Sequence, residues 1–100
     1  KDIMVVVTGE FGRTYKINAN AGRDHWPKLS PLMISGGDFL MGHAIGKSTS
    51  KAEEPLTDPY NPQNVTATLL KHFGIDQHTQ RTDMSGRPRY FLEVGAESIL

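Results

Sequence analysis

The chain has 100 residues, and its 11 Lys and Arg residues balance its 11 Asp and Glu residues, so the formal net charge is zero. This balance gives no basis for binding nucleic acid or an anionic membrane, and neither partner is expected. The chain contains no cysteine, which excludes disulfides and thiolate-bound metals. Any metal ion must therefore be held by His, Asp or Glu side chains.

The first apolar run is "IMVVVT" at residues 3–8, and its apolar residues are consecutive rather than alternating. Such a run predicts a strand that is buried on both faces, as in a parallel sheet covered by helices. The segment "PLMIS" at 31–35 predicts a second strand, and "HAIG" at 43–46 predicts a third, weaker one.

The segments 9–30 and 36–61 are long for connections in so small a domain. Such lengths indicate either functional loops or a chain that is part of something larger. The chain starts at Lys1 without Met or a leader, and a strand is predicted from Ile3 onwards. We therefore expect residues 1–100 to be a portion of one larger domain, whose remainder lies upstream in the same polypeptide.

A helix is predicted after residue 61, where Asn61 is a capping residue and Pro62 occupies the first helical position. Gly74 is expected to end it. One face is apolar, with i, i+4, i+8 spacing: Val65, Leu69 and Phe73. Strand, loop, strand, loop and helix in this order indicate part of an α/β protein.

The C-terminal segment "RTDMSGRPRYFLEVGAESIL" contains a turn signal at Ser85 and Gly86. An apolar patch follows at residues 90–92. Together they predict a short strand or the arm of a hairpin.

Glu10 follows the first predicted strand by two residues, and Gly9 and Gly12 flank it. Ligands of open parallel sheets bind beyond the carboxyl ends of the strands. A carboxylate presented there can bind a metal ion or act as a base. The alternative is a surface glutamate in a turn.

The segment "GRDHW" brings Arg23, Asp24 and His25 together in sequence. Asp24 and His25 point in opposite directions if the backbone is extended, so one can bind a metal while the other orients a neighbour. With Glu10 and Arg13, this loop has the groups of a site for a metal and a phosphate or sulfate. The alternative is a salt-bridged loop with a packed tryptophan.

The segment "GHAIGKST" at 42–49 is similar to a phosphate-binding loop. The pattern requires glycine at position 41, where Met41 stands, and no strong helix is predicted after Lys47. Nucleotide binding is therefore the weakest of the hypotheses considered.

Five segments resemble the C-terminal third of the bacterial DUF1501 proteins: "VVVTGEFGRT", "NAGRDHWP", "ISGGDFLMGHAIGKST", "NVTATLLKHFGID" and "SGRPRYF". The resemblance runs in order over nearly the whole chain. It implies a relative of the sulfatase and alkaline-phosphatase-like superfamily, and hence the C-terminal part of an α/β/α sandwich. Members with this pattern are often exported, which suggests a periplasmic or exported protein.

The resemblance also implies a site with divalent metal ions, of which Zn, Mn, Mg and Ca are candidates. Glu10 and His25 are the implied metal ligands, with Asp24 as a further candidate. Arg13 and Arg23 belong to the family pattern, and we expect them to hold the anionic group of a small ester substrate.

This sequence departs from the superfamily pattern after the first strand, where an Asp-His pair is expected. Glu10 takes the place of the carboxylate, and Phe11 stands where the histidine would be. The nucleophile and first carboxylate ligands of the superfamily would lie upstream, so no catalytic nucleophile is expected in these 100 residues. The chain alone is expected to be inactive.

The first hypothesis is therefore the C-terminal part of a metal-dependent hydrolase of phosphate or sulfate esters. The second is a non-catalytic binding or structural module with a degraded metal site, which Phe11 favours.

Overall fold

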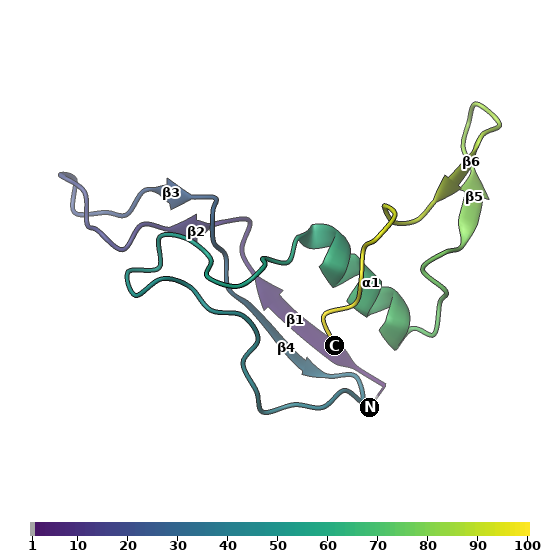
Figure 1. Cartoon of the computed structure of the whole chain (residues 1–100), viewed down its shortest axis with the longest axis horizontal. Helices are drawn as coiled ribbons and strands as arrows, with labels where there is room; N and C mark the ends of the chain where they lie inside the picture. The colour runs from purple at the N-terminus through teal and green to yellow at the C-terminus, as the bar shows by residue number, and fades with distance from the viewer. Residues whose placement is uncertain (1) are drawn as a thin grey trace. The chain divides into compact units, whose positions relative to one another are not determined.

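The computed structural model describes residues 2–100, which form two compact units (Figure 1). The first unit comprises the chain up to Gly37 together with Met41–Pro59. The second comprises Asp38–Leu40 and Tyr60–Leu100.

The first unit is built around strands β1 (Met4–Thr8) and β4 (Leu32–Gly36), which pair antiparallel. The register places Met4 opposite Gly36 and Thr8 opposite Leu32. The two strands expected at residues 3–8 and 31–35 are therefore present.

The expected α/β/α sandwich with a mostly parallel sheet is wrong. Every sheet in residues 2–100 is a two-stranded antiparallel ribbon. The physical reason lies in residues 9–31, which contain no helix. A parallel neighbour requires a crossover connection, usually helical, whereas a chain that folds back on itself pairs antiparallel.

Strand β1 is not buried on both faces within the described residues. Val5 and Val7 are 49% and 53% exposed, and Met33, opposite Val7, is 57% exposed. The consecutive apolar residues of β1 thus give the ribbon one exposed apolar face, while Met4 and Val6 are half-buried.

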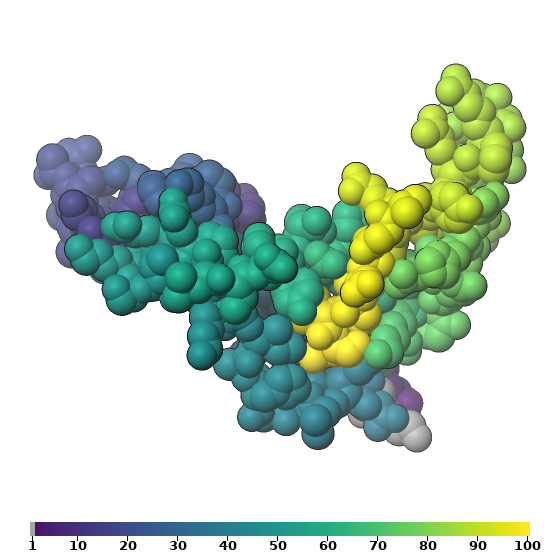
Figure 2. Space-filling model, in the orientation of Figure 1, coloured from purple at the N-terminus to yellow at the C-terminus, as the bar shows by residue number. Residues whose placement is uncertain are grey.

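Strands β2 (Gly12–Arg13) and β3 (His25–Trp26) form a second antiparallel ribbon inside the β1–β4 connection. Residues 47–57 lie beside this ribbon (Figures 1 and 2), and the Trp26 indole Nε1 donates to the carbonyl oxygen of Glu53 at 2.7 Å. This contact joins two segments that are distant in sequence.

The strand expected at residues 43–46 is not formed. Beyond it, the chain makes a single bridge between Ser48 and Pro55. No helix follows Lys47 in this part of the described chain, so the segment lacks the helix N-terminus of a phosphate-binding loop.

Helix α1 (Pro62–His72) confirms the predicted helix of the second unit. The Asn61 side chain accepts hydrogen bonds from the backbone N–H groups of Gln63 and Asn64, and the Asn64 side chain accepts from the backbone N–H of Asn61. Gly74 adopts φ +69° just beyond the helix end, which is the conformation that favours glycine after a helix.

The buried face of α1 differs from the predicted one. Ala67 and Thr68 are 1% and 0% exposed, whereas Phe73 is 68% exposed and Leu69 is half-buried. The reason is the C-terminal segment 97–100, which packs along the face that carries Thr68.

This packing depends on hydrogen bonds as well as on apolar contact. The Thr68 hydroxyl accepts from the backbone N–H of Ile99 at 2.9 Å and donates to the carbonyl of Asn64 at 2.8 Å. Asn64 Nδ2 donates to the carbonyl of Glu97, and Lys71 Nζ donates to the backbone oxygen of Leu100.

Strands β5 (Gln80–Thr82) and β6 (Pro88–Tyr90) form the hairpin predicted around Ser85 and Gly86. The Asp83 carboxylate organises the turn by accepting from the backbone N–H groups of Ser85 and Arg87, both at 2.9 Å. Within residues 2–100, no helix is long and apolar enough to span a bilayer.

Candidate functional site

The β2–β3 ribbon gathers four of the five predicted site residues. Arg13 lies on β2, Arg23 and Asp24 lead into β3, and His25 is the first residue of β3. The register pairs Arg13 directly with His25. Since the ribbon joins segments ten or more positions apart, the grouping is a result of the fold.

Gly12 allows this ribbon to form. A Cβ atom at position 12 would collide with the carbonyl oxygen of Leu29. The backbone of residue 29 thus approaches β2 so closely that only glycine fits at position 12 without a shift.

His25 packs against Phe11. Their ring centroids are 4.3 Å apart and the rings are tilted by 40°. Arg13 Cζ lies 6.0 Å from the centroid of Phe11, so the same ring also contacts a cation. Position 11 and His25 are therefore neighbours in space, and an apolar ring occupies position 11.

Both arginines brace the ribbon. Arg13 Nη1 donates to the carbonyl of Arg23 at 3.0 Å. Arg23 Nη1 donates to the carbonyls of Thr14 and Tyr15 at 2.8 and 2.6 Å. Each guanidinium has further N–H donors, so this bracing leaves donors for an anion.

Asp24 is held by the loop at the end of the ribbon. Its Oδ1 accepts from Asn18 Nδ2 at 2.9 Å. Asn18 Oδ1 in turn accepts from the backbone N–H groups of Asn20 and Gly22. Asn18 therefore organises the turn, a role that was not predicted. The turn-forming residues of "NANAG" were the available signal.

Glu10 stands in a bend between β1 and β2 and is exposed. Its carboxylate makes no hydrogen bond or ion pair with any residue from 2 to 100, His25 included. The residue of this bend that touches His25 is Phe11.

The donor set has the right chemistry for a divalent cation, since carboxylate oxygen and imidazole nitrogen are common metal ligands. Over residues 2–100, however, no group of three or more His, Asp and Glu side chains is arranged to hold a metal ion. Glu10, His25 and Asp24 do not by themselves form a metal site.

A cavity of about 360 Å³ lies beside the ribbon in the first unit. Its lining includes Tyr15, Asn18, Asp24, Trp26 and Glu53. The sequence indicated Asp24 and Trp26 but not the cavity. Residues 52–53, which also line it, come from a segment distant in sequence.

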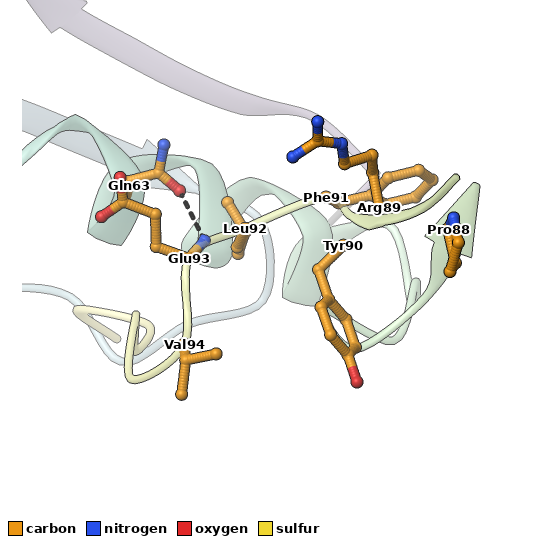
Figure 3. Close-up of a pocket in the computed structure, with 8 residues that line it drawn as sticks. All are labelled: Gln63, Pro88, Arg89, Tyr90, Phe91, Leu92, Glu93 and Val94. Carbon is orange, nitrogen blue, oxygen red and sulfur yellow. Dashed lines mark hydrogen bonds between the residues drawn. The ribbon is translucent and has the colours of Figure 1, made fainter. Parts of the chain in front are cut away.

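A second cavity, also of about 360 Å³, lies against residues 88–94 and Gln63 of the second unit. Figure 3 shows Arg89 pointing to one side of this segment and Tyr90 and Val94 to the other. Its polar groups do not converge, and the one hydrogen bond drawn joins Gln63 Oε1 to the backbone N–H of Glu93.

These features define a protein segment of antiparallel ribbons and one capped helix, with a polar hairpin that carries two arginines, an aspartate and a histidine. The chain belongs to the DUF1501 family, because the family model described as "Protein of unknown function (DUF1501)" matches residues 1–99. No curated protein and no solved structure matches the chain.

Proposed function

We propose that this segment of a DUF1501 protein contributes to a metal-dependent site that hydrolyses phosphate or sulfate esters. The sequence basis is the resemblance of "GEFGRT" and "GRDHWP" to the DUF1501 proteins, which implies a relative of the sulfatase and alkaline-phosphatase-like superfamily. The observation that carries the proposal is the approach of residue 11 to His25, since it brings the Glu10 bend to the β3 histidine.

In this proposal Glu10 and His25 are two ligands of one divalent cation, and Asp24 is a further candidate. The side chains of Glu10 and His25 are both exposed, so a cation and ligands from elsewhere in the polypeptide have access to them. Arg13 and Arg23 would hold the anionic group through the guanidinium donors that do not bind carbonyls. When bound, the metal would supply Lewis-acid polarisation of the ester oxygen.

The second candidate function is a non-catalytic binding or structural module. A specific observation favours it: Phe11 fills the position next to His25 with an apolar ring. The internal hydrogen bonds of Arg13, Arg23 and Asp24 agree with a bracing role for these residues.

The test is metal analysis of the full-length protein, combined with turnover of an aryl phosphate and an aryl sulfate. Under the first proposal, Glu10→Gln and His25→Ala each lower metal occupancy by about tenfold or more, as loss of a ligand does. His78→Ala is the matched control, because His78 is exposed in the second unit. Unchanged occupancy in both ligand variants would reject the ligand assignment and favour the module.

A further inference from the structure

We infer that the cavity lined by Tyr15, Asp24, Trp26 and Glu53 binds a neutral sugar ring. Its volume of about 360 Å³ falls in the range of small-molecule sites, roughly 300–1,000 Å³. Of the proposed metal ligands, Asp24 lines this cavity, whereas Glu10 and His25 do not. The inference is therefore tested with divalent metal removed, so that sugar binding and metal binding are separated.

The first argument is the aromatic wall. Tyr15 and Trp26 are both half-buried and both line the cavity. The hydrogen bond from Trp26 Nε1 to the carbonyl of Glu53, 2.7 Å long, holds the indole in place. Fixed aromatic rings offer apolar surface at little entropic cost, which suits the C–H face of a pyranose.

The second argument concerns two carboxylates of residues that line the cavity, Glu53 and Asp24, which have hydrogen-bonding capacity left for a ligand. The Glu53 carboxylate makes no hydrogen bond or ion pair with any residue between 2 and 100. Asp24 uses Oδ1 for Asn18 and has no second side-chain partner in the same range. Ionised carboxylates only accept hydrogen bonds, so the ligand must donate them, as sugar hydroxyl groups do.

The third argument is charge. Lys16 and Lys51 place their ammonium groups 5.8 and 5.7 Å from the Tyr15 ring centroid. Lys28 Nζ lies 5.6 Å from the Trp26 ring centroid. These ammonium groups and the two carboxylates place charges of both signs around the rings, so neither a cation nor an anion has a one-sided electrostatic advantage. Lysine N–H groups donate hydrogen bonds and carboxylates accept them, and sugar hydroxyl groups, which both donate and accept, can pair with each kind. A sugar ring that stacks on the aromatic surface must displace the flexible lysine ammonium groups from it.

The chain offers a direct reporter, because Trp26 is its single tryptophan. The experiment titrates the chain with glucose, galactose and mannose separately, in EDTA, and follows tryptophan fluorescence and the indole N–H resonance. Tetramethylammonium chloride and sodium sulfate are titrated in parallel as a cation and an anion.

We expect a saturable change with at least one hexose. Glu53→Gln, whose side chain makes no contact that the fold requires, weakens this binding about tenfold, because a neutral amide oxygen replaces the charged acceptor. Tyr15→Ala weakens it similarly, whereas Tyr15→Phe retains the ring and most of the affinity. Glu93→Gln, in the second unit, leaves it unchanged.

Three outcomes overturn the inference. One is the absence of saturation with every hexose up to about 100 mM, well beyond the millimolar range of weak binding. Another is saturation by tetramethylammonium or sulfate instead of a hexose. The third is equal hexose affinity in the native chain and in Glu53→Gln. Because EDTA removes divalent metal throughout, none of these results bears on the proposed metal site.

Discussion

The ring of Phe11 lies against the imidazole of His25, with 4.3 Å between their centroids. This contact places the residue that departs from the superfamily pattern beside one of the two implied metal ligands. A substitution of Phe11 therefore tests whether the β2–β3 ribbon retains the geometry of a metal site.

Replacing Phe11 by histidine should create metal affinity in the chain. Phe11→His brings a second imidazole next to His25 and close in sequence to the exposed Glu10, and imidazole and carboxylate groups bind Zn²⁺. We expect Zn²⁺ to bind about tenfold or more tightly than to the native chain, measured by isothermal titration calorimetry.

The matched control is Phe11→Tyr, which retains an aromatic ring but adds no imidazole. Equal zinc affinity of Phe11→His and Phe11→Tyr would show that the two side chains do not meet in a ligating geometry. Adding His25→Ala to Phe11→His should remove the gain.

Gly12→Ala should destabilise the β2–β3 ribbon. The new methyl group would overlap the carbonyl oxygen of Leu29, and such overpacking costs about 1–3 kcal/mol. Urea unfolding followed by the fluorescence of Trp26, the cross-strand partner of Gly12, measures the loss.

Gly9→Ala is the control for this change. A Cβ atom at position 9 has an ordinary nearest contact, 3.7 Å from the carbonyl oxygen of Phe11. A Gly12→Ala variant as stable as Gly9→Ala would contradict the close approach of residue 29 to β2.

Thr68→Val should loosen the C-terminal segment from α1. Thr68 is fully buried, and the change leaves the backbone N–H of Ile99 without its acceptor. An unsatisfied buried group costs about 1–3 kcal/mol. Hydrogen exchange of the Ile99 amide should therefore speed up, while the exposed Thr66→Val control changes stability by less than about 0.5 kcal/mol. Unchanged protection of Ile99 in Thr68→Val would refute the contact.

The β5–β6 turn should open at low pH. The backbone N–H of Arg87 and the side chain of Arg89 both hydrogen-bond to Asp83 and lower the pKa of its carboxyl group. Because the pKa of Asp83 is lower in the folded state, the ionised carboxylate stabilises the turn fully above the unfolded pKa of about 3.9. This stabilisation is lost as the pH falls through the lower folded value.

The amide proton resonances of Ser85 and Arg87 report this transition, and they should titrate below the ordinary aspartate range. Asp83→Asn retains the acceptor oxygen for Ser85 and Arg87 but removes the charge, so its amide resonances should lose the pH dependence. A midpoint at or above about 3.9 in the native chain would contradict the prediction.

The elements with local signals were predicted correctly. Asn61 and Pro62 define the start of α1 within a few residues of chain. The turn around Ser85 and Gly86 is likewise defined by local features. The Asp83 side chain accepts a hydrogen bond from the backbone N–H of Ser85, and Gly86 adopts φ +79°. Both depend on hydrogen bonds between residues at most four positions apart.

The relative orientation of β1 and β4 was predicted wrongly because no local signal in the sequence sets it. A run of consecutive apolar residues indicates a strand, but it does not state which strand lies beside it or in which direction. The apolar face of α1 was misjudged in the same way, because Thr68 is buried where residues 97–100 dock on the helix.

The grouping of Arg13, Arg23, Asp24 and His25 in one loop was visible in the sequence as a candidate site. Their partners were not, because the Phe11 ring meets His25 across the ribbon and the Asn18 amide meets Asp24 through a turn.

The sequence by itself determined the family, the position of the helix, the hairpin turn and the residue types available for chemistry, since these follow from motifs and local hydrogen bonds. Only the tertiary structure decided that the strands pair antiparallel, that Phe11 lies against His25, and that Tyr15, Trp26 and Glu53 line one cavity. These contacts join segments that are distant along the chain, and their free energies depend on which surfaces meet rather than on the preference of any single residue.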